Sequence, residues 1–294
     1  MTAAVAAPGL AAARPAAAPA IAASAPAAAL PDLRHAWYPA SRCGDHCREQ
    51  TPVVVNLVVV MVRMVRLVVV VCFLVVFGPM VALAPRLLRR RFLSRAARHL
   101  LAALGVAVRI DDRRPFAGTS RGLVVANHVS YLDILAVAVV SPSHFVAKSD
   151  VTTMPVVSGL ARRLGIIPVE RASLRELPAT IRSAVDELHR DRSVAVFPEG
   201  TTWCGREAGR FRPAFFQAAI DAGVPVTPIR LRFTAMDGSP TSAPSFIGDD
   251  NPLDTLRRVL RARGLTADIR VHESQLPDTD RRTLAARCER LVTA

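Results

Sequence analysis

The sequence predicts an α/β domain with a mixed, largely parallel sheet flanked by helices, preceded by an N-terminal membrane helix or helix pair. From residue 105 onward, short apolar runs alternate with helical stretches, a pattern typical of α/β folds. A strongly apolar segment over residues 53–84 comes before them. Of the 294 residues, 51% are hydrophobic and 21% are charged. That balance favours a domain attached to a membrane over a protein made mostly of membrane spans.

Residues 1–52 are predicted to form a disordered tail and linker. About the first 31 residues are nearly all Ala and Pro, which gives the segment little to bury and too much proline for a steady helix. The tail also lacks the basic start and the apolar run of a secretory signal.

The cysteines predict neither a disulfide framework nor a metal site. They are odd in number and scattered along the chain, at Cys43, Cys47, Cys72, Cys204 and Cys288. His46 lies between the first two in the stretch RCGDHC, but no second pair of ligands follows at the spacing of a zinc site. We interpret Cys204, like its neighbour Trp203, as a packing residue.

Residues 53–84 are predicted to enter the membrane, since Arg63 and Arg66 are their only charges. The uncharged part beyond Arg66 has about the 18–20 residues that one crossing needs, so a single membrane helix fits. Two short helices that dip into one leaflet and break at Gly78 and Pro79 fit as well. In that arrangement both arginines reach toward the headgroups.

A basic amphipathic helix is predicted next, over residues 85–100. Six arginines lie in it, at Arg86, Arg89, Arg90, Arg91, Arg95 and Arg98. Its apolar residues fall near helical spacing, so it can lie on anionic lipid, with a solvated helix face as the alternative. By the positive-inside rule this flank stays in the cytoplasm. We therefore predict that residues 53–104 attach the chain to the cell membrane and that the domain at 105–294 lies on the cytoplasmic side.

The formal net charge of +14 predicts attraction to polyanions. Aromatic residues make up only 5% of the chain, and the sequence has no zinc-finger or RNP-like pattern. We therefore expect anionic membrane lipid as a partner and no nucleic acid.

Short apolar runs predict the strands of the domain. Their ranges are 106–110, 122–127, 144–148, 166–169, 193–197, 226–233 and 268–273. The clearest helix lies within 173–190, where Ser173 and Glu176 fit a capping box. Pro178 fits a later start instead. Further helices are predicted over 130–140, between Pro213 and Gly223, and between Pro252 and Gly264.

The strand over 122–127 ends in Asn127 and His128, and Asp133 follows in the first turns of the next helix. In open α/β sheets, ligands sit just beyond the carboxyl ends of the strands. A carboxylate there can fix the tautomer of the imidazole and stabilise the imidazolium, which makes a general base without a protein nucleophile. The alternative is a helix start capped by Asn127 and His128, with Asp133 as an ordinary first-turn acid.

A second polar group follows the strand over 193–197. It consists of Pro198, Glu199, Gly200 and Thr201. Gly200 lets the backbone approach a ligand closely, and exposed amides there can bind an anion. Since both groups follow strands, we expect them to share one edge of the sheet.

Four blocks along the chain resemble the glycerolipid acyltransferases, in particular the 1-acyl-sn-glycerol-3-phosphate acyltransferase family. They are NHVSYLD (127–133), GIIPVER (165–171), FPEGT (197–201) and VPVTPI (224–229). The resemblance covers about residues 60–235. It implies acyl transfer from acyl-CoA or acyl-carrier protein to the free hydroxyl of lysophosphatidic acid or a similar lysolipid, without an acyl-enzyme and without any other cofactor.

The resemblance also implies roles for individual residues. His128 takes the hydroxyl proton, Asp133 orients it, and Asn127 shapes the turn. Four more positions match ones associated with acceptor binding, namely Arg171, Glu199, Gly200 and Thr201. Lys148 is the only lysine of the chain and ends a strand at the same edge, so we predict that it contacts a phosphate.

One position departs from the family pattern. The third block commonly continues with Arg, but here Thr202 follows Thr201. In this sequence, Arg206 or Arg210 of the same loop is a candidate to supply the positive charge of that missing Arg. Alternatively the acceptor has another headgroup, as in the lyso-ornithine lipid acyltransferases, whose third block resembles FPEGTT. A third alternative is a non-catalytic, lipid-binding membrane protein.

Overall fold

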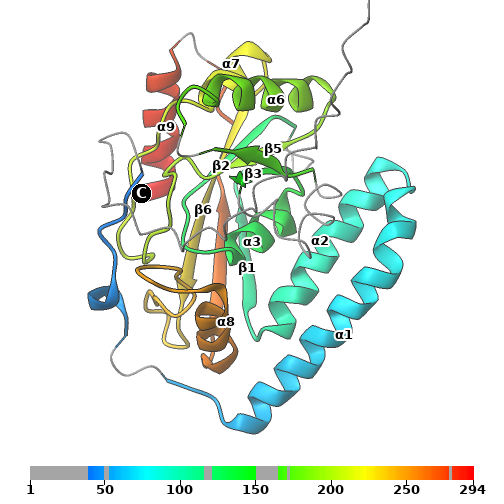
Figure 1. Cartoon of the computed structure of the whole chain (residues 1–294), viewed down its shortest axis with the longest axis vertical. Helices are drawn as coiled ribbons and strands as arrows, with labels where there is room; N and C mark the ends of the chain where they lie inside the picture. The colour runs from blue at the N-terminus through cyan, green and yellow to red at the C-terminus, as the bar shows by residue number, and fades with distance from the viewer. Residues whose placement is uncertain (1–38, 50–52, 116–120, 150–164, 171–172, 278–279) are drawn as a thin grey trace, which may run out of the picture. The chain divides into compact units, whose positions relative to one another are not determined.

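A seven-stranded sheet forms the centre of the computed structural model, which describes residues 39–49, 53–115, 121–149, 165–170, 173–277 and 280–294. The strands lie in the order β1-β7-β6-β2-β5-β3-β4 (Figure 1). Their bounds are β1 Ala107–Asp112, β2 Leu123–Ala126, β3 His144–Lys148, β4 Ile167–Val169, β5 Val194–Val196, β6 Val226–Thr234 and β7 Thr266–Val271. All seven predicted strands are confirmed, with ends shifted by at most two residues.

The sheet is mixed and largely parallel, as predicted. Strands β6, β2, β5, β3 and β4 run parallel to one another, whereas β7 is antiparallel to β6 and parallel to β1. Every residue of β2 is buried, because helices cover both faces of the sheet there. Val124 and Ala126 pack into one core cluster and Leu123 and Val125 into the other.

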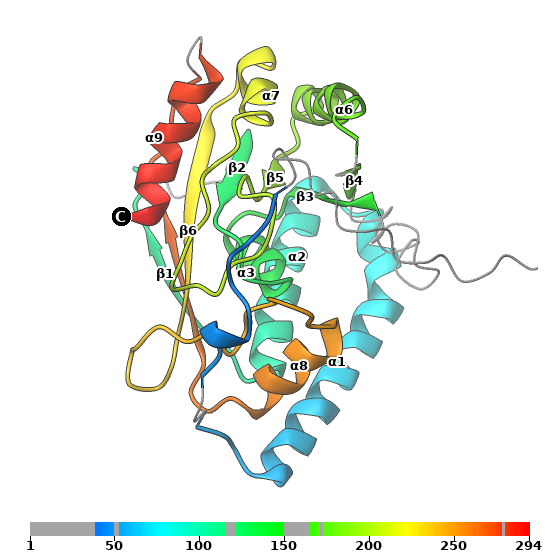
Figure 2. The same cartoon turned by 60° about the vertical axis from the view of Figure 1, so that its left-hand side comes forward.

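Helices α2 (Arg86–Ala103), α3 (Leu132–Val140) and α8 (Pro252–Arg261) contribute to the first cluster. Helices α6 (Leu177–His189), α7 (Phe216–Asp221) and α9 (Arg281–Thr293) contribute to the second, on the other side of the sheet (Figures 1 and 2). Opposite faces of β2 therefore support two cores, and its carboxyl end lies between them.

Helices α3, α7 and α8 lie within the predicted limits, but two details differ. Helix α6 begins at Leu177 with Pro178 in its first turn, and Glu176 at its N-cap makes no side-chain capping bond. The later start is therefore confirmed, and the capping box is wrong. Helix α9 was not predicted, although Asp280 caps it by accepting hydrogen bonds from the backbone of Arg282 and Thr283.

Helix α1 (Leu57–Ala82) is one continuous helix that contains Pro79, so the alternative of two short helices broken at Gly78 is wrong. Its part from Leu57 to Val81 has a mean hydropathy of 2.8 and is not buried inside the protein, so it is long and apolar enough to cross a membrane. Helices α1 and α2 lie side by side (Figures 1 and 2).

The side chain of Arg63 in α1 binds the protein rather than reaching out toward headgroups, which corrects our expectation. Its Nη1 donates hydrogen bonds of 2.8 Å to the carbonyls of Leu260 and Ala262. These carbonyls lie at the C-terminal end of α8, where a cation is favoured by the helix dipole. A Cβ added at Gly105 would lie 2.2 Å from the Arg63 guanidinium, so only glycine leaves room for it.

Candidate active site

The imidazole of His128 and the carboxylate of Asp133 are in direct contact, 2.8 Å apart from Nδ1 to Oδ2. Asp133 is fully buried in the first turn of α3. The same Oδ2 accepts backbone N–H bonds from Val129 at 2.5 Å and Ser130 at 2.8 Å. Asp133 therefore accepts the amides of the helix start and also faces the imidazole. The alternative in which Asn127 and His128 cap the helix is wrong, because the N-cap of α3 is Tyr131 and makes no side-chain capping bond.

This contact decides which imidazole nitrogen is available for chemistry. A carboxylate opposite Nδ1 favours the tautomer with the proton on Nδ1, which leaves Nε2 as a proton acceptor. The ring stacks on Phe197 with centroids 4.1 Å apart and planes 10° apart. The His128 side chain remains 14% exposed. The imidazole is thus fixed on one side and covered on one face while part of it reaches the surface.

Glu199 holds the loop of His128 through the backbone. Its Oε2 accepts the N–H of His128 at 2.6 Å, and its Oε1 accepts the N–H of Gly209 at 2.9 Å. Burial raises the pKa of this carboxyl to about 8, against the lowering effect of the two N–H groups. Both oxygens are thus engaged within the chain, which gives Glu199 a positioning role.

The turn formed by Pro198, Glu199, Gly200 and Thr201, here called the P-E-G-T turn, packs against the loop of His128. Gly200 has a φ of +76°, and a Cβ there would lie 2.9 Å from the Cβ of Pro39, so both backbone and space require glycine. Trp203 donates its backbone N–H to the His128 carbonyl at 2.8 Å. The Thr202 hydroxyl donates to the carbonyl of Phe246. The two predicted groups therefore do meet, because β2 and β5 are parallel neighbours in the sheet.

Asn127 links the same loop to β6. Its Nδ2 donates to the Leu231 carbonyl at 2.9 Å, and its Oδ1 accepts the Leu231 N–H at 2.8 Å. Both ends of the amide are used, so this side chain fixes the loop after β2 to β6.

Lys148 and Thr201 lie at this edge of the sheet as well. Lys148 is the last residue of β3 and pairs with Val169 of β4, and it is half-buried. Thr201 is also half-buried, in the turn after β5. Arg171 lies outside the described residues, but Glu170 before it accepts a bond of 2.9 Å from the Ser149 hydroxyl. Glu170 of the second block thus contacts the residue that follows β3.

Sequence reasoning missed two residues near the site, Phe197 and Arg212. Phe197 stacks on the imidazole, and its position directly before the P-E-G-T turn was the available signal. The backbone of Arg212 donates to the Pro198 carbonyl at 2.9 Å, and its Cδ is 3.6 Å from the position of a Cβ on Gly200. Arg206, by contrast, lies 3.5 Å from Glu49. Arg212 is therefore a cation of this loop that contacts the turn through its backbone, and the stem of its side chain lies near Gly200.

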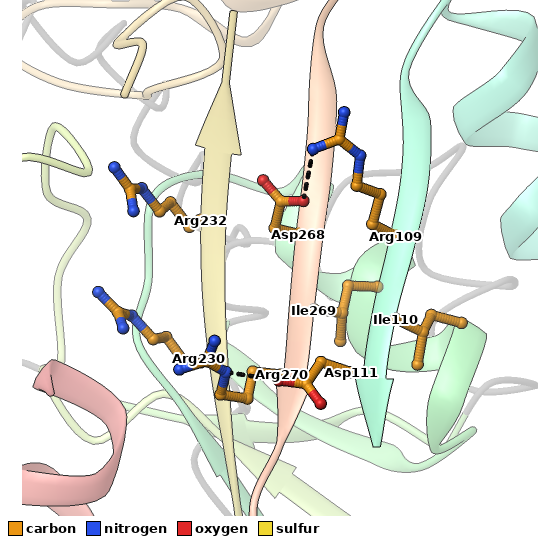
Figure 3. A pocket seen from close by; sticks show the side chains of 8 residues that line it. All are labelled: Arg109, Ile110, Asp111, Arg230, Arg232, Asp268, Ile269 and Arg270. Atoms are coloured by element: carbon orange, nitrogen blue, oxygen red, sulfur yellow. Dashed lines mark hydrogen bonds and ion pairs between the residues drawn. The ribbon is translucent and has the colours of Figure 1, made fainter. Parts of the chain in front are cut away.

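A separate hollow of about 300 Å³ lies on the exposed faces of β1, β7 and β6 (Figure 3). Its lining residues are Arg109, Ile110, Asp111, Arg230, Arg232, Asp268, Ile269 and Arg270. Arg270 donates to Asp111 at 2.8 Å, and Arg109 lies 3.8 Å from Asp268. None of the predicted site residues that the structure describes lines it. It is an arginine-rich patch on the sheet and not the site of the His128–Asp133 pair.

Comparisons with known proteins agree with the resemblance. The profile of a family described as Acyltransferase matches residues 106–232. A 1-acyl-sn-glycerol-3-phosphate acyltransferase of Neisseria meningitidis serogroup B is 35% identical over 179 residues, which are 60% of this chain and 69% of that protein. A lyso-ornithine lipid O-acyltransferase of Pseudomonas aeruginosa is 34% identical over 207 residues, which are 70% of this chain and 78% of that protein.

The fold also has a counterpart among solved structures. The crystal structure of the 1-acyl-sn-glycerophosphate (LPA) acyltransferase from Thermotoga maritima matches with a TM-score of 0.57, at 20% sequence identity. The match covers 78% of this chain and 94% of that one, and at this identity it shows the shared fold. With the sequence matches beside it, the chain belongs to the 1-acyl-sn-glycerol-3-phosphate acyltransferase family, whose NHxxxxD and FPEGT motifs it carries at one edge of its sheet.

Proposed function

We propose that this acyltransferase moves a fatty acyl chain from acyl-CoA or acyl-carrier protein to the free hydroxyl of lysophosphatidic acid or a similar lysolipid, with His128 as the general base. The observation that carries the proposal is the 2.8 Å contact between His128 and the buried Asp133 beside the P-E-G-T turn. Its position at the carboxyl ends of parallel strands is where α/β folds bind their ligands.

In this mechanism Nε2 of His128 removes the proton of the acceptor hydroxyl as the oxygen attacks the thioester carbonyl. The tetrahedral intermediate then expels the thiolate, which takes the proton from the imidazolium and leaves as the free thiol. Asp133 stabilises the imidazolium and holds the ring in place. The transfer is direct, so no covalent acyl-enzyme forms.

We propose that three cations, Lys148, Arg171 and Arg212, bind the acceptor headgroup. A phosphate near a low-dielectric surface needs donors that stay charged, which Arg and Lys supply. Thr202 stands where the family commonly has Arg, and its hydroxyl is bonded to the Phe246 carbonyl. One relative of this chain is named for 1-acyl-sn-glycerol-3-phosphate, which is lysophosphatidic acid, and another for lyso-ornithine lipid. Lyso-ornithine lipid is therefore the alternative acceptor.

The direct test is an assay of the membrane-bound chain with both lysolipids, each offered with both thioester donors. Release of free thiol and formation of the diacylated product are measured together. The proposal expects product with at least one pair, and a higher kcat/KM for lysophosphatidic acid. A preference for lyso-ornithine lipid would establish the alternative, and lipid binding without thiol release in any pair would refute the enzymatic proposal. Membranes from the same host without the chain serve as the blank.

We further propose that residues 53–104 attach the catalytic domain at 105–294 to the cytoplasmic face of the membrane, with α1 lying in one leaflet. Arg63 near the start of α1 binds α8, and Arg86 just after its end lies 3.8 Å from Asp191. The N-terminal part of α1 and the start of α2, which follows its C-terminal end, thus contact one domain, whereas the ends of a spanning helix lie on opposite sides of the bilayer.

A spin label on Cys72 tests this placement, because Cys72 is exposed on α1 and the other described cysteines are buried. A helix lying in the leaflet places the label about 5–10 Å below the headgroups. A label at the bilayer centre, about 15 Å deep, would instead establish a span.

A further inference from the structure

Three buried cysteine side chains meet beside the P-E-G-T turn. Cys43 and Cys47 lie around the short 3-10 helix η1 (Asp45–Cys47), and Cys204 follows the turn. Their three sulfur atoms all lie within 4.8 Å of one another. Each residue is at most 9% exposed, and Ile247 and Trp203 pack around them. Two segments far apart in the sequence thus bring three soft ligands to one point.

Backbone N–H groups point at these sulfur atoms. The N–H of Cys204 donates to Sγ of Cys43 at 3.4 Å. The N–H groups of Arg206 and Glu207 donate to Sγ of Cys204. Gly205, which lies between Cys204 and Arg206, has a φ of +83°, which turns the chain back onto the sulfur of Cys204. N–H···S bonds of this kind orient ligand sulfurs and stabilise the thiolate form that binds metal ions.

The acidities of the thiols agree with this geometry. Burial acts to raise the pKa of Cys204, but the N–H groups of Glu207 and Arg206 and the thiols of Cys43 and Cys47 bring it below its ordinary value. Burial raises the pKa of Cys43 to about 11.

We propose that Cys43, Cys47 and Cys204 form a binding site for a thiophilic metal ion, with zinc as the expected occupant. Thiolate ligands select zinc and copper(I) over harder ions. With Zn–S distances of about 2.3 Å, two sulfurs of a tetrahedral site are about 3.8 Å apart, so the three sulfurs need to move together by less than about 1 Å. A water molecule completes the fourth position, as zinc sites with three protein ligands allow.

The site joins the segment around Cys43 to the loop that supports the catalytic base. Trp203, next to Cys204, donates its N–H to the His128 carbonyl. Gly209, farther along the loop, binds Glu199. A metal ion would therefore hold the loop that positions His128. The role goes beyond the proposed acyl transfer and does not depend on the acceptor.

The test uses the full chain, purified in mild detergent with a phosphine reductant from cells grown with added zinc. Metal content per chain is measured by mass spectrometry of the elements. We expect about one zinc per chain, and a fall of more than about tenfold when Cys43, Cys47 or Cys204 is replaced by Ser. Cys288→Ser is the matched control, since Cys288 is equally buried but lies in α9, outside the cluster. It is expected to keep the zinc.

A second measurement, on the wild-type chain, keeps the proposal testable if a Cys→Ser variant fails to fold. Zinc is removed from the wild-type chain with a chelator and replaced by cobalt(II), which gives thiolate-to-metal charge-transfer absorption when sulfur ligands bind it. Three results would overturn the proposal: a wild-type chain that holds neither zinc nor cobalt, equal zinc in Cys204→Ser and wild type, or a disulfide between two of the three cysteines in the reduced preparation. The readouts are metal content and absorption, so a failure here is distinct from a loss of acyl transfer.

Discussion

The backbone N–H of His128 donates a 2.6 Å hydrogen bond to Oε2 of Glu199. The other oxygen of this carboxyl binds the N–H of Gly209, so one buried side chain links the loop after β2 to two parts of the loop after β5. The Glu of the FPEGT motif thus acts on the base through the backbone. Replacing Glu199 should therefore disturb the position of His128 rather than a direct substrate contact.

Glu199→Ala is therefore expected to lower both stability and turnover. It leaves the amides of His128 and Gly209 without their acceptor, and a buried amide without a partner costs about 1–3 kcal/mol. The melting temperature and the kcat of acyl transfer, measured on the same preparation, should both fall. Glu207→Ala, an exposed glutamate of the same loop, is the control. Equal melting temperatures for the two variants would contradict the role given to Glu199.

The titration of Glu199 gives a separate, pH-dependent prediction. Its pKa is raised from 4.5 to about 8, so between these values the folded chain keeps a proton that the unfolded chain has lost. The contribution of this group to the free energy of unfolding therefore falls as the pH rises from about 4.5 to about 8. Glu199→Gln does not titrate and should lack this fall. Melting temperatures of both proteins across that range check it, and parallel curves would show that Glu199 titrates normally.

Removal of the base is expected to abolish acyl transfer. His128→Ala and Asp133→Asn should each lower kcat by about 10²–10⁴, because general-base assistance is worth that much. Asp133→Asn also alters an oxygen that accepts three hydrogen bonds, so circular dichroism is needed to show that the variant folds. Asp186→Asn, on the exposed side of α6, is the matched control. An active His128→Ala would refute the assignment of the base.

The sequence was sufficient to predict the seven strands in the described part of the chain, because most of them are short, largely apolar runs bounded by turn residues. It also predicted that His128 and Glu199 share an edge, since both follow parallel strands and the carboxyl ends of such strands meet. The nature of their contact was not predictable, because the donor is a backbone N–H that any residue carries.

The contacts that sequence reasoning missed join distant segments. Arg63 binds carbonyls 197 and 199 residues away, at Leu260 and Ala262, and any residue type supplies a carbonyl. Cys204 reaches Cys43 across 161 residues, so the spacing of Cys43 and Cys47 alone showed only two of the three sulfurs. Such pairs depend on how the loops pack, which local patterns do not contain.

Arg63 offers a test of how α1 is held on the domain. Arg63→Leu removes two hydrogen bonds to the end of α8 and leaves both carbonyls unpaired, so we expect a loss of about 1–3 kcal/mol in stability. Arg66→Leu, on an exposed position of the same helix, makes the same chemical change without these bonds. The melting temperature in detergent should fall for the first variant and change little for the second. The reverse order would show that α1 is held by other contacts.

Acceptor choice is expected to depend on Arg212. Its Cδ lies near Gly200 of the P-E-G-T turn. Arg210, two residues earlier, is exposed as Arg212 is, and it serves as the matched control. If Arg212 holds the acceptor phosphate, Arg212→Gln loses a charge-assisted bond worth about 1.5–3 kcal/mol, which raises KM for lysophosphatidic acid roughly 10- to 100-fold.

The change in kcat should be smaller than the change in KM, since Arg212 is expected to bind ground and transition states alike. Lyso-ornithine lipid carries an amino-acid headgroup in place of the phosphate, so its KM should respond less. Arg210→Gln should leave both values close to those of the wild type. An equal rise of KM for both acceptors in Arg212→Gln would mean that the residue supports the turn rather than reading the headgroup, and the phosphate contact would then fall to Lys148 or Arg171.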